Sequence, residues 1–515
     1  MCSGRTAGFR RTPTPASRSW LVRPIIWTKT FTRPFIPTPP CRMRIVNTCI
    51  PGMPIDDEQL TTNILTLLRA EEGIMTAQTS RRVVITGMGV ISPLGCTVDL
   101  FWHLLSKGAS AVKPIRSFDT SPFQACLAAE VSDFDPEDFL HRKQARRMGR
   151  ATQFAVASAM MAARDSGIDL EQEDRGAIGI SIGTSIGGMK EAFEFHDAAK
   201  LTAYERVNPF TMGMTFPNAI SSEVAIVLGL HGPCETYSIG CSSTANAIGR
   251  AYEWIKSGQA SLVVAGGTEA PLHPSVYAAM NAGRALAPDE RGAIRNLPRP
   301  FDKHRCGMVL GEGAGSFILE DYEHARARGA RMYAELEGWG FTCDAHSMVK
   351  AAATGQEQQR AARLALSTAH WFPEEVDYVN ACGLGTMELD ALETHTVKQV
   401  LGTHAYRVPV SSFKAALGHA FAASGAFQLI GTAKAMEHQF IPPTLNLTTP
   451  DPTCDLDYVS GEGRVAHIDR ALINSFGFGG KNIVLALSRI DARVAMTNPM
   501  AATPGYGLHH LAGVS

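Results

Sequence analysis

A cysteine at a predicted strand-to-helix junction is the first residue whose position could support chemistry. Residues 235–250 read ETYSIGCSSTANAIGR, so Cys241 follows a strand-like run and precedes a helix of small residues. The free N–H groups at a helix N-terminus stabilise a thiolate and bind the oxyanion of an acyl-transfer intermediate. A lone cysteine is more often a small buried apolar residue. Cys241 is therefore a candidate nucleophile that needs support from other segments.

A lysine and a histidine follow another predicted strand. Residues 410–426 read VSSFKAALGHAFAASGA and place Lys414 and His419 in a loop that leads into a helix. Gly418 and Gly425 flank the histidine and allow a ligand to approach closely. A neutral imidazole there could donate a hydrogen bond to a thioester carbonyl or an enolate. Taken by itself, the segment fits a histidine that only caps its own loop.

Two glycine-rich loops also follow predicted strands. Residues 474–482 read NSFGFGGKN, which is too short and misplaced for a dinucleotide fingerprint and could be a plain hairpin. Residues 378–393 read YVNACGLGTMELDALE and run from strand through loop to helix. Asp390 and Glu393 are one helical turn apart, so one of them could face Lys414. The alternative is a solvated helix N-terminus, where acidic residues are favourable.

Short apolar strands alternate with helices along the middle of the chain. The first part contains predicted strands at 83–86, 178–182, 261–265 and 316–319 and helices at 97–105 and 151–163. The pattern then restarts near Arg331, with strands at 332–336, 376–380, 408–411, 471–474 and 483–487 and helices at 356–369, 389–400 and 422–437. This alternation predicts an α/β fold with sheets covered on both faces and two similar halves.

Composition limits the class of protein. The chain of 515 residues has a formal net charge of -1, which argues against a general nucleic-acid binder. It has no run of roughly 20 uncharged apolar residues, so no membrane span is expected. The 11 cysteines contain no CxxC pair that suggests zinc, and scattered thiols fit a reducing compartment, so we expect a cytoplasmic protein without a metal.

The two ends of the chain differ from its middle. The first 54 residues contain about nine basic and no acidic residues, a composition that also occurs in organelle transit peptides. The other interpretation is that translation starts later, at Met75. We therefore expect a disordered or spurious extension over 1–79, with organelle import only if it is real. We expect the two halves at 80–330 and 331–490, and a flexible tail over 491–515.

Together, the four segments resemble the β-ketoacyl-acyl-carrier-protein synthases, or ketosynthases, of the elongating type II kind, in the order known for that family. Further matches are VVITGMGVISPL at 83–94, VAGGTE at 264–269, RPFDK at 299–303 and GEGAG at 311–315. The resemblance covers residues 80–490. It implies a thiolase fold with five layers, α-β-α-β-α, and a homodimer, or a heterodimer with another ketosynthase.

The resemblance also implies catalytic roles. Cys241 would accept an acyl group from acyl carrier protein. His419 would hydrogen-bond the malonyl thioester of a second carrier protein and stabilise the enolate formed by decarboxylation. Lys414 and Glu393 would form a supporting ion pair, and Phe478 would gate the cysteine. No bound metal or organic cofactor is implied.

Binding residues are implied in the same way. Thr386 matches a threonine that contacts pantetheine, and Phe476 and Gly479 would line the substrate site. A basic segment resembles the patch that docks the acidic carrier protein, although a solvated helix face would look the same. Its residues are Arg142, Lys143, Arg146 and Arg147.

The chain departs from the family at a catalytic position. Cys382 stands where elongating members have a further histidine, Leu384 replaces a pantetheine-binding threonine, and residues 344–348 read DAHSM where the family has DAYHM. A thiol is a poorer donor and base than imidazole, and such acid–base help is worth roughly 10² to 10⁴ in rate. Acylation of Cys241 should survive, whereas condensation is left open. His395, farther along the helix, is another candidate to reach the site.

Three hypotheses follow. The leading one is a ketosynthase-like acyltransferase in fatty-acid or polyketide synthesis that elongates by a modified mechanism. The second is a transferase that passes on an acyl chain without condensing it. The third is a non-catalytic partner subunit similar to a chain-length factor. The presence of Cys241, His419 and Phe478 argues against the third, because such partners typically lack the cysteine.

Overall fold

The structure is a computed structural model that describes residues 81–201, 205, 208–288 and 297–490. The predicted extension over 1–79 and the predicted tail over 491–515 lie outside these residues. Within them, no helix is long and apolar enough to cross a membrane.

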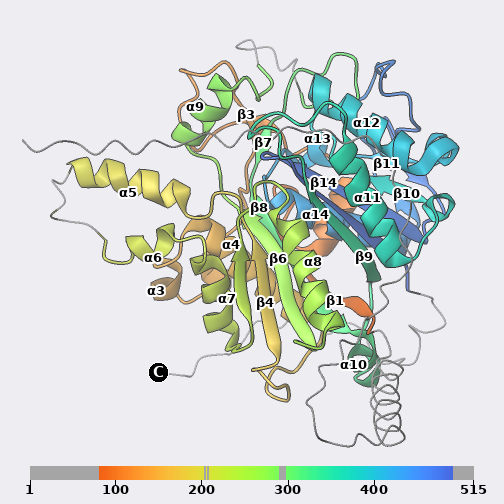
Figure 1. The fold of residues 1–515 in the computed structure, drawn as a ribbon. Coiled ribbons are helices and arrows are strands. Elements are labelled where there is room, and N and C mark those ends of the chain that lie inside the picture. The colour runs from red at the N-terminus through yellow and green to blue at the C-terminus, as the bar shows by residue number, and fades with distance from the viewer. Residues whose placement is uncertain (1–80, 202–204, 206–207, 289–296, 491–515) are drawn as a thin grey trace, which may run out of the picture. The chain divides into compact units, whose positions relative to one another are not determined.

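Ten strands form one sheet made of two five-stranded halves (Figure 1). The first half contains β1 (Val83–Ile91), β4 (Ile178–Gly183), β5 (Cys234–Tyr237), β6 (Leu262–Glu269) and β8 (Gly313–Asp321). The second half contains β9 (Ala334–Cys343), β10 (Tyr378–Asn380), β11 (Val410–Ser411), β14 (Arg470–Gly477) and β15 (Lys481–Ser488). Counted from the outer edge of the sheet inward, each half contains its third, second, fourth, fifth and first strand in chain order. The repeat confirms the two similar halves.

The strand directions repeat as well. In each half the first two pairs, counted from the outer edge, are parallel and the other two are antiparallel. The halves join where β1 pairs with β9, beginning with Val83 opposite Leu336.

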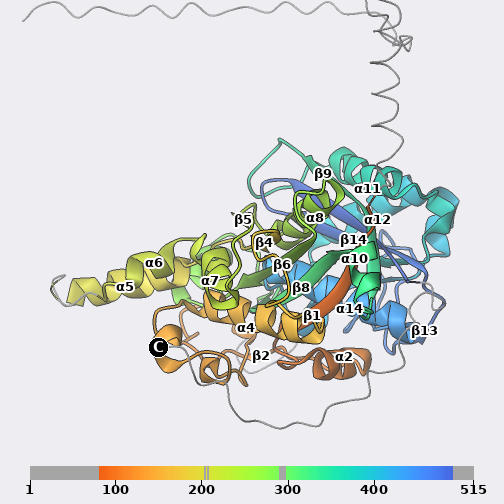
Figure 2. The same ribbon diagram turned by 90° about the horizontal axis from the view of Figure 1, so that it is seen from below.

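Helices form three further layers (Figures 1 and 2). The central layer consists of α8 (Ser243–Lys256) and α14 (Ala423–His438), which contact strands of both halves. The outer layers are α4 (Arg150–Asp165) with α7 (Ala219–Leu228), and α11 (Gln356–Ala369) with α12 (Met387–Leu401). Residues 423–436 of α14 are all buried, as a helix enclosed between the two halves of the sheet must be. The predicted five-layered thiolase fold is thereby confirmed.

The remaining elements connect these layers. The other helices are α2 (Val98–Ser106), α3 (Arg142–Ala145), α5 (Met189–Leu201), α6 (Thr211–Thr215), α9 (Pro274–Ala282), α10 (Tyr322–Ala327) and α13 (Lys414–Leu417), with 3-10 turns η1 (Pro136–Asp138), η2 (Pro373–Glu375) and η3 (Gly402–Tyr406). Two small sheets contain β2 (Lys113–Pro114), β3 (Leu127–Ala129) and β7 (Leu310–Gly311), and β12 (Phe440–Ile441) and β13 (Arg464–Val465).

The strand that opens each half is longer than the sequence predicts. The predicted strands stop at Thr86 and Leu336, whereas β1 and β9 continue beyond both residues. A Cβ atom at Gly87 would lie 2.1 Å from the carbonyl oxygen of Ala162 in α4, and one at Gly340 would lie 2.0 Å from that of Ala361 in α11. Glycine here therefore lets a helix pack closely on a strand, which does not end at that point.

Candidate active site

The predicted nucleophile lies between β5 and α8, where the chain turns sharply. Gly240 has a φ of +84°, which a residue with a side chain rarely adopts. α8 begins two residues after Cys241, and Ser242 donates hydrogen bonds to the carbonyl oxygens of Ser475 and Lys481, each 3.0 Å away. The β14–β15 hairpin, which carries the glycine-rich loop, is thereby attached to the cysteine segment.

Cys241 and His419 form a close pair, although they lie far apart in sequence. Cys241 Sγ is 3.1 Å from His419 Nε2, and Nδ1 of the same ring is 3.2 Å from Ser424 Oγ. Desolvation raises the pKa of Cys241 to about 12. Burial, assisted by the charge of Lys414, lowers the pKa of His419 well below its usual value. The resting pair is therefore a neutral thiol and a neutral imidazole, so desolvation outweighs the thiolate stabilisation that was expected from the helix N-terminus.

The neutral pair predicts how the reactivity of Cys241 depends on pH. Below its pKa, the thiolate fraction rises about tenfold per pH unit, so alkylation by iodoacetamide should accelerate from pH 7 to pH 10 without a plateau. The rate is measured by peptide mapping of the Cys241 peptide, with a matched measurement in His419→Ala. A plateau that begins near pH 6 would instead indicate a thiolate–imidazolium pair at rest.

Cys382 is held through its main chain from two sides. Its N–H donates to Glu393 Oε1 over 2.8 Å, and the next N–H, of Gly383, donates to Oε2 over 2.8 Å. Its carbonyl oxygen accepts a 2.6 Å hydrogen bond from Lys414 Nζ. Lys414 and Glu393 thus form no ion pair with each other, contrary to expectation. They bind opposite ends of the same residue.

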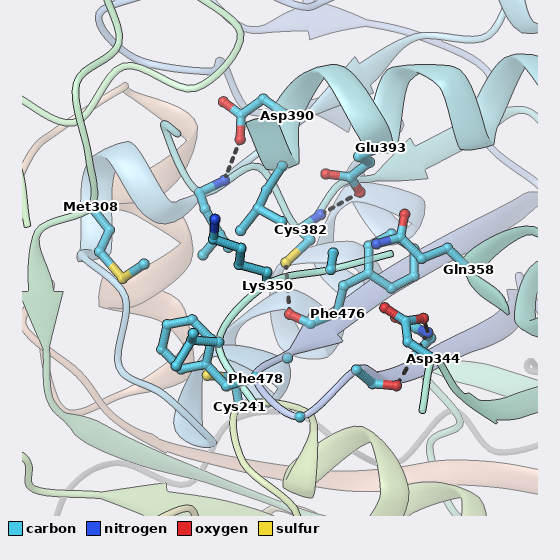
Figure 3. Close-up of a pocket in the computed structure, with 18 of the residues that line it drawn as sticks. Cys241, Met308, Asp344, Lys350, Gln358, Cys382, Asp390, Glu393, Phe476 and Phe478 are labelled. Atoms are coloured by element: carbon cyan, nitrogen blue, oxygen red, sulfur yellow. Dashed lines mark hydrogen bonds between the residues drawn. The ribbon is translucent and has the colours of Figure 1, made fainter. Parts of the chain in front are cut away.

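The Cys382 side chain is buried and hydrogen-bonded to the main chain. Its Sγ donates to the carbonyl oxygen of Phe476 over 3.5 Å (Figure 3). Burial raises the pKa of this thiol, which keeps it neutral. Lys414 Nζ lies 3.9 Å from the same sulfur. The single S–H donor of Cys382 is therefore already used in a hydrogen bond within the protein.

One cavity connects these groups. It encloses about 590 Å³, including its open mouth, and both thiols, the His419 ring and Gly479 line it. Phe476 and Phe478 line it as well (Figure 3). Neither Thr386 nor His395 is among its lining residues. Thr386 precedes α12, and its hydroxyl has no hydrogen-bond partner in the described part of the chain. His395 is exposed on the same helix.

The lining residues that were not predicted as site residues include Gln358, Asn482 and Asp344. Gln358 comes from α11, Asn482 from β15 and Asp344 from the loop after β9. Asn482 Nδ2 donates to Asp344 Oδ1 over 2.6 Å. Two of these residues lie in segments noted in the sequence, the NSFGFGGKN loop and the DAHSM loop, but Gln358 belongs to no motif and has no signal of its own.

A buried arginine anchors the loop that carries Cys382. Arg305 donates to the carbonyl oxygens of Thr386 and Met387, each at 2.9 Å, and to Asp451 Oδ2 at 2.7 Å. Its side chain has no exposed surface. Arg305 therefore satisfies two of the carbonyls at the start of α12 and a buried carboxylate.

Replacing Arg305 by methionine should lower the free energy of unfolding by about 3–5 kcal/mol, because it leaves the carboxylate of Asp451 unpaired. Urea denaturation of both proteins measures the difference. The matched control is Arg326→Met, which removes only the exposed pair with Glu323 and should change stability by less than about 1 kcal/mol. Equal effects of the two changes would contradict the anchoring role.

The predicted basic segment is on the surface. Lys143 lies within α3, Arg146 and Arg147 follow it, and all three residues are exposed. Arg142 pairs with Glu137 over 3.4 Å, and the guanidinium of Arg147 lies 4.4 Å from the ring centre of Phe210. The exposed positions are compatible with docking an acidic protein.

A doubled α/β fold with a contacting cysteine–histidine pair that lines a cavity defines a thiolase-fold acyltransferase. Residues 80–325 match the model of the beta-ketoacyl synthase N-terminal domain, and residues 333–448 match that of the C-terminal domain. The chain belongs to the beta-ketoacyl synthase family of condensing acyltransferases.

Individual relatives agree with this assignment. The chain is 41% identical over 410 residues to 3-oxoacyl-[acyl-carrier-protein] synthase 2 of Synechocystis sp., which covers 79% of this chain and 98% of that protein. It is 40% identical to the protein of the same name from Coxiella burnetii, over 80% of this chain and 99% of the other.

Solved structures are similar as well. The ishigamide ketosynthase/chain length factor has a TM-score of 0.76 and 34% identity, and the match covers 80% of this chain and all of the other. The structure of a type II PKS acyl-carrier protein in complex with its ketosynthase, AntDE:AntF, has a TM-score of 0.74 and 33% identity. The match covers 80% of this chain and all of the other.

Proposed function

We propose that this chain is a 3-oxoacyl-acyl-carrier-protein synthase of fatty-acid or polyketide synthesis. It transfers an acyl group from acyl carrier protein to Cys241 and extends it by decarboxylative condensation with malonyl carrier protein. The observation that carries the proposal is the 3.1 Å contact between Cys241 Sγ and His419 Nε2 in a cavity that opens to the surface. The relatives named 3-oxoacyl-[acyl-carrier-protein] synthase 2 support the same activity.

The first step is transfer of the acyl group to Cys241. Its sulfur attacks the thioester carbon while neutral His419 accepts the thiol proton. The N–H of Phe478 points toward the sulfur and is placed to stabilise the oxyanion. The bond from carbon to the pantetheine sulfur then breaks, and the proton passes to the departing thiolate.

The second step is condensation. The bond to the malonyl carboxylate breaks and releases carbon dioxide, and the resulting enolate attacks the acyl carbon so that the Cys241 thiolate leaves and is protonated. Here His419 must donate from Nε2 to the thioester oxygen. The Ser424 hydroxyl, which can donate or accept at Nδ1, supports both forms of the ring. The nearby ammonium group of Lys414 favours the negative enolate.

We propose that Cys382 replaces a second histidine of the family and that this replacement slows condensation rather than acylation. Its thiol donates to the carbonyl oxygen of Phe476 and so cannot supply the missing donor to the thioester. This contact is also the specific observation that favours the second candidate function, a transferase that loads and passes on an acyl chain without extending it.

The partners that we propose follow from the site and the relatives. Acyl carrier protein would dock on the exposed basic side chains of Lys143, Arg146 and Arg147. A similar ketosynthase forms a complex with its acyl-carrier protein, and another forms a pair with a chain length factor. We propose a homodimer here, because the intact pair of Cys241 and His419 argues against a subunit that only assists another ketosynthase.

A two-stage reaction of the full chain tests the proposal. The protein is mixed with acyl carrier protein that bears a medium acyl chain, and its intact mass is recorded before malonyl carrier protein is added. An acyl adduct followed by a product two carbons longer supports the synthase. An adduct without extension supports the transferase, and the absence of any adduct contradicts both.

A further inference from the structure

One side of the active-site cavity is polar, and we call it the polar branch. It is lined by Asp344, Gln358 and Asn482, and in the view of Figure 3 the labelled Asp344 and Gln358 lie on the side of Cys382 away from Met308. Gln358 is 2% exposed and Asn482 is 1% exposed. The branch is part of the same cavity as Cys241, so a group bound there can belong to the substrate.

The polar branch contains a side-chain donor and a side-chain acceptor that form no hydrogen bond among the described residues. Gln358 Oε1 accepts a 3.0 Å hydrogen bond from Thr396 Oγ1, which orients the amide, while its Nε2 has no partner among the described residues. Asn482 Nδ2 donates to Asp344 Oδ1 and to the carbonyl oxygen of Gly480, whereas its Oδ1 has no partner in the same set. Because both residues line the cavity, this donor and this acceptor are available to a ligand.

The surroundings of Cys241 indicate which part of the substrate reaches this branch. Cys241 and Phe478 also pack against a separate apolar cluster that includes Leu310 and Phe421. An acyl chain on Cys241 is best accommodated by that cluster, since its methylene groups gain from apolar contact. The polar branch is then left for the incoming extender unit.

We propose that the polar branch binds a short substituent on the α-carbon of the extender unit, one that ends in a group able both to accept and to donate hydrogen bonds, such as a primary amide. The amide oxygen accepts from Gln358 Nε2, and its nitrogen donates to Asn482 Oδ1. The inference rests on the proposed function, because it places a malonyl-type thioester beside Cys241. Cys382 lines the same cavity, and its thiol fills less of that cavity than an imidazole would.

Two analogues of equal shape test the inference by binding. Both are malonyl pantetheine derivatives in which nitrogen replaces the thioester sulfur, so that neither can transfer its acyl group. One carries a carbamoylmethyl group on the α-carbon and the other an isobutyl group, which has the same number of heavy atoms but no polar atom. Calorimetry on the full chain with Cys241→Ala should give about 100-fold tighter binding of the amide, because a site built for hydrogen bonds rejects an analogue that lacks them.

Two variants of Gln358 connect the preference to the branch. Gln358→Leu should reduce it to less than about threefold, and Gln358→Glu, which keeps an acceptor for Thr396 but removes the donor, should do the same. Melting temperatures show whether each variant folds. If one of the two Gln358 variants does not fold, the binding preference of the other one tests the inference.

Equal affinities for the two analogues in the Cys241→Ala protein would overturn the inference, as would a preference that persists in a folded Gln358 variant. These measurements require no catalysis. A failure of the proposed function appears instead as a missing acyl adduct on the unmodified chain, so the two failures are distinguishable.

Discussion

Replacing Cys241 by alanine should abolish the covalent acyl adduct and lower the rate of product formation at least about 10³-fold. The sulfur is the atom that His419 contacts, and no other described thiol contacts that ring. Removal of a nucleophile leaves only the contribution of binding and of the oxyanion donors, and single members of catalytic groups typically cost that much or more. Intact mass after incubation with acyl carrier protein measures the adduct directly.

The matched control for this variant is Cys306→Ala, which removes an exposed cysteine outside the cavity. It should leave the adduct and the rate unchanged. Because Cys241→Ala removes only one sulfur atom, its melting temperature should stay close to that of the original protein. An adduct of unchanged amount in Cys241→Ala would show that another group accepts the acyl chain and would remove the basis for the proposed mechanism.

Replacing Cys382 by histidine should raise the rate of condensation with unsubstituted malonyl carrier protein about 10²-fold, whereas acylation of Cys241 should change little. An imidazole supplies the second donor and base that the present thiol cannot provide, since that thiol is bonded to the carbonyl oxygen of Phe476. Single-turnover measurements separate the two steps: mass spectrometry follows the acyl adduct, and chromatography follows the longer product.

Two comparisons make the result specific. Cys382→Ser keeps the size of the side chain without adding a base and should give no acceleration. In Cys382→His the larger ring fills part of the cavity that Cys382 lines, so the preference for the carbamoylmethyl analogue should fall as condensation accelerates. Equal condensation rates in the original protein and in Cys382→His would mean that condensation does not depend on a base at this position.

The sequence predicts well what depends on local pattern. Cys241 is identified by a strand, a turn and a helix that follow one another, and His419 by a similar sequence of loop and helix. The structure brings the two together although they are 178 positions apart. The proximity follows from the doubled topology, in which each half delivers one loop to the same end of the central helices. The repeat of strands and helices likewise predicts the two halves.

What depends on the reach of individual side chains could not be predicted. Lys414 and Glu393 carry opposite charges and were expected to pair, but the main chain of Cys382 lies between them and offers each a better partner. Gln358 sits in a helix whose pattern marks it only as a buried face. Gln358 lines the cavity because α11 packs against β9 and β15. This packing cannot be predicted from any short segment of the sequence. The role of Thr386 in contacting pantetheine and the role of Phe478 in gating Cys241 remain predictions.

The main-chain hydrogen bonds that hold Cys382 have a consequence for how such enzymes diverge. Glu393 and Lys414 bind its amide and its carbonyl, groups that every residue except proline possesses. The path of the loop therefore does not depend on which side chain stands at this position. A single codon change can exchange a thiol for another functional group without dismantling the surrounding scaffold, so the balance between loading and extension can be adjusted during evolution while the fold is preserved.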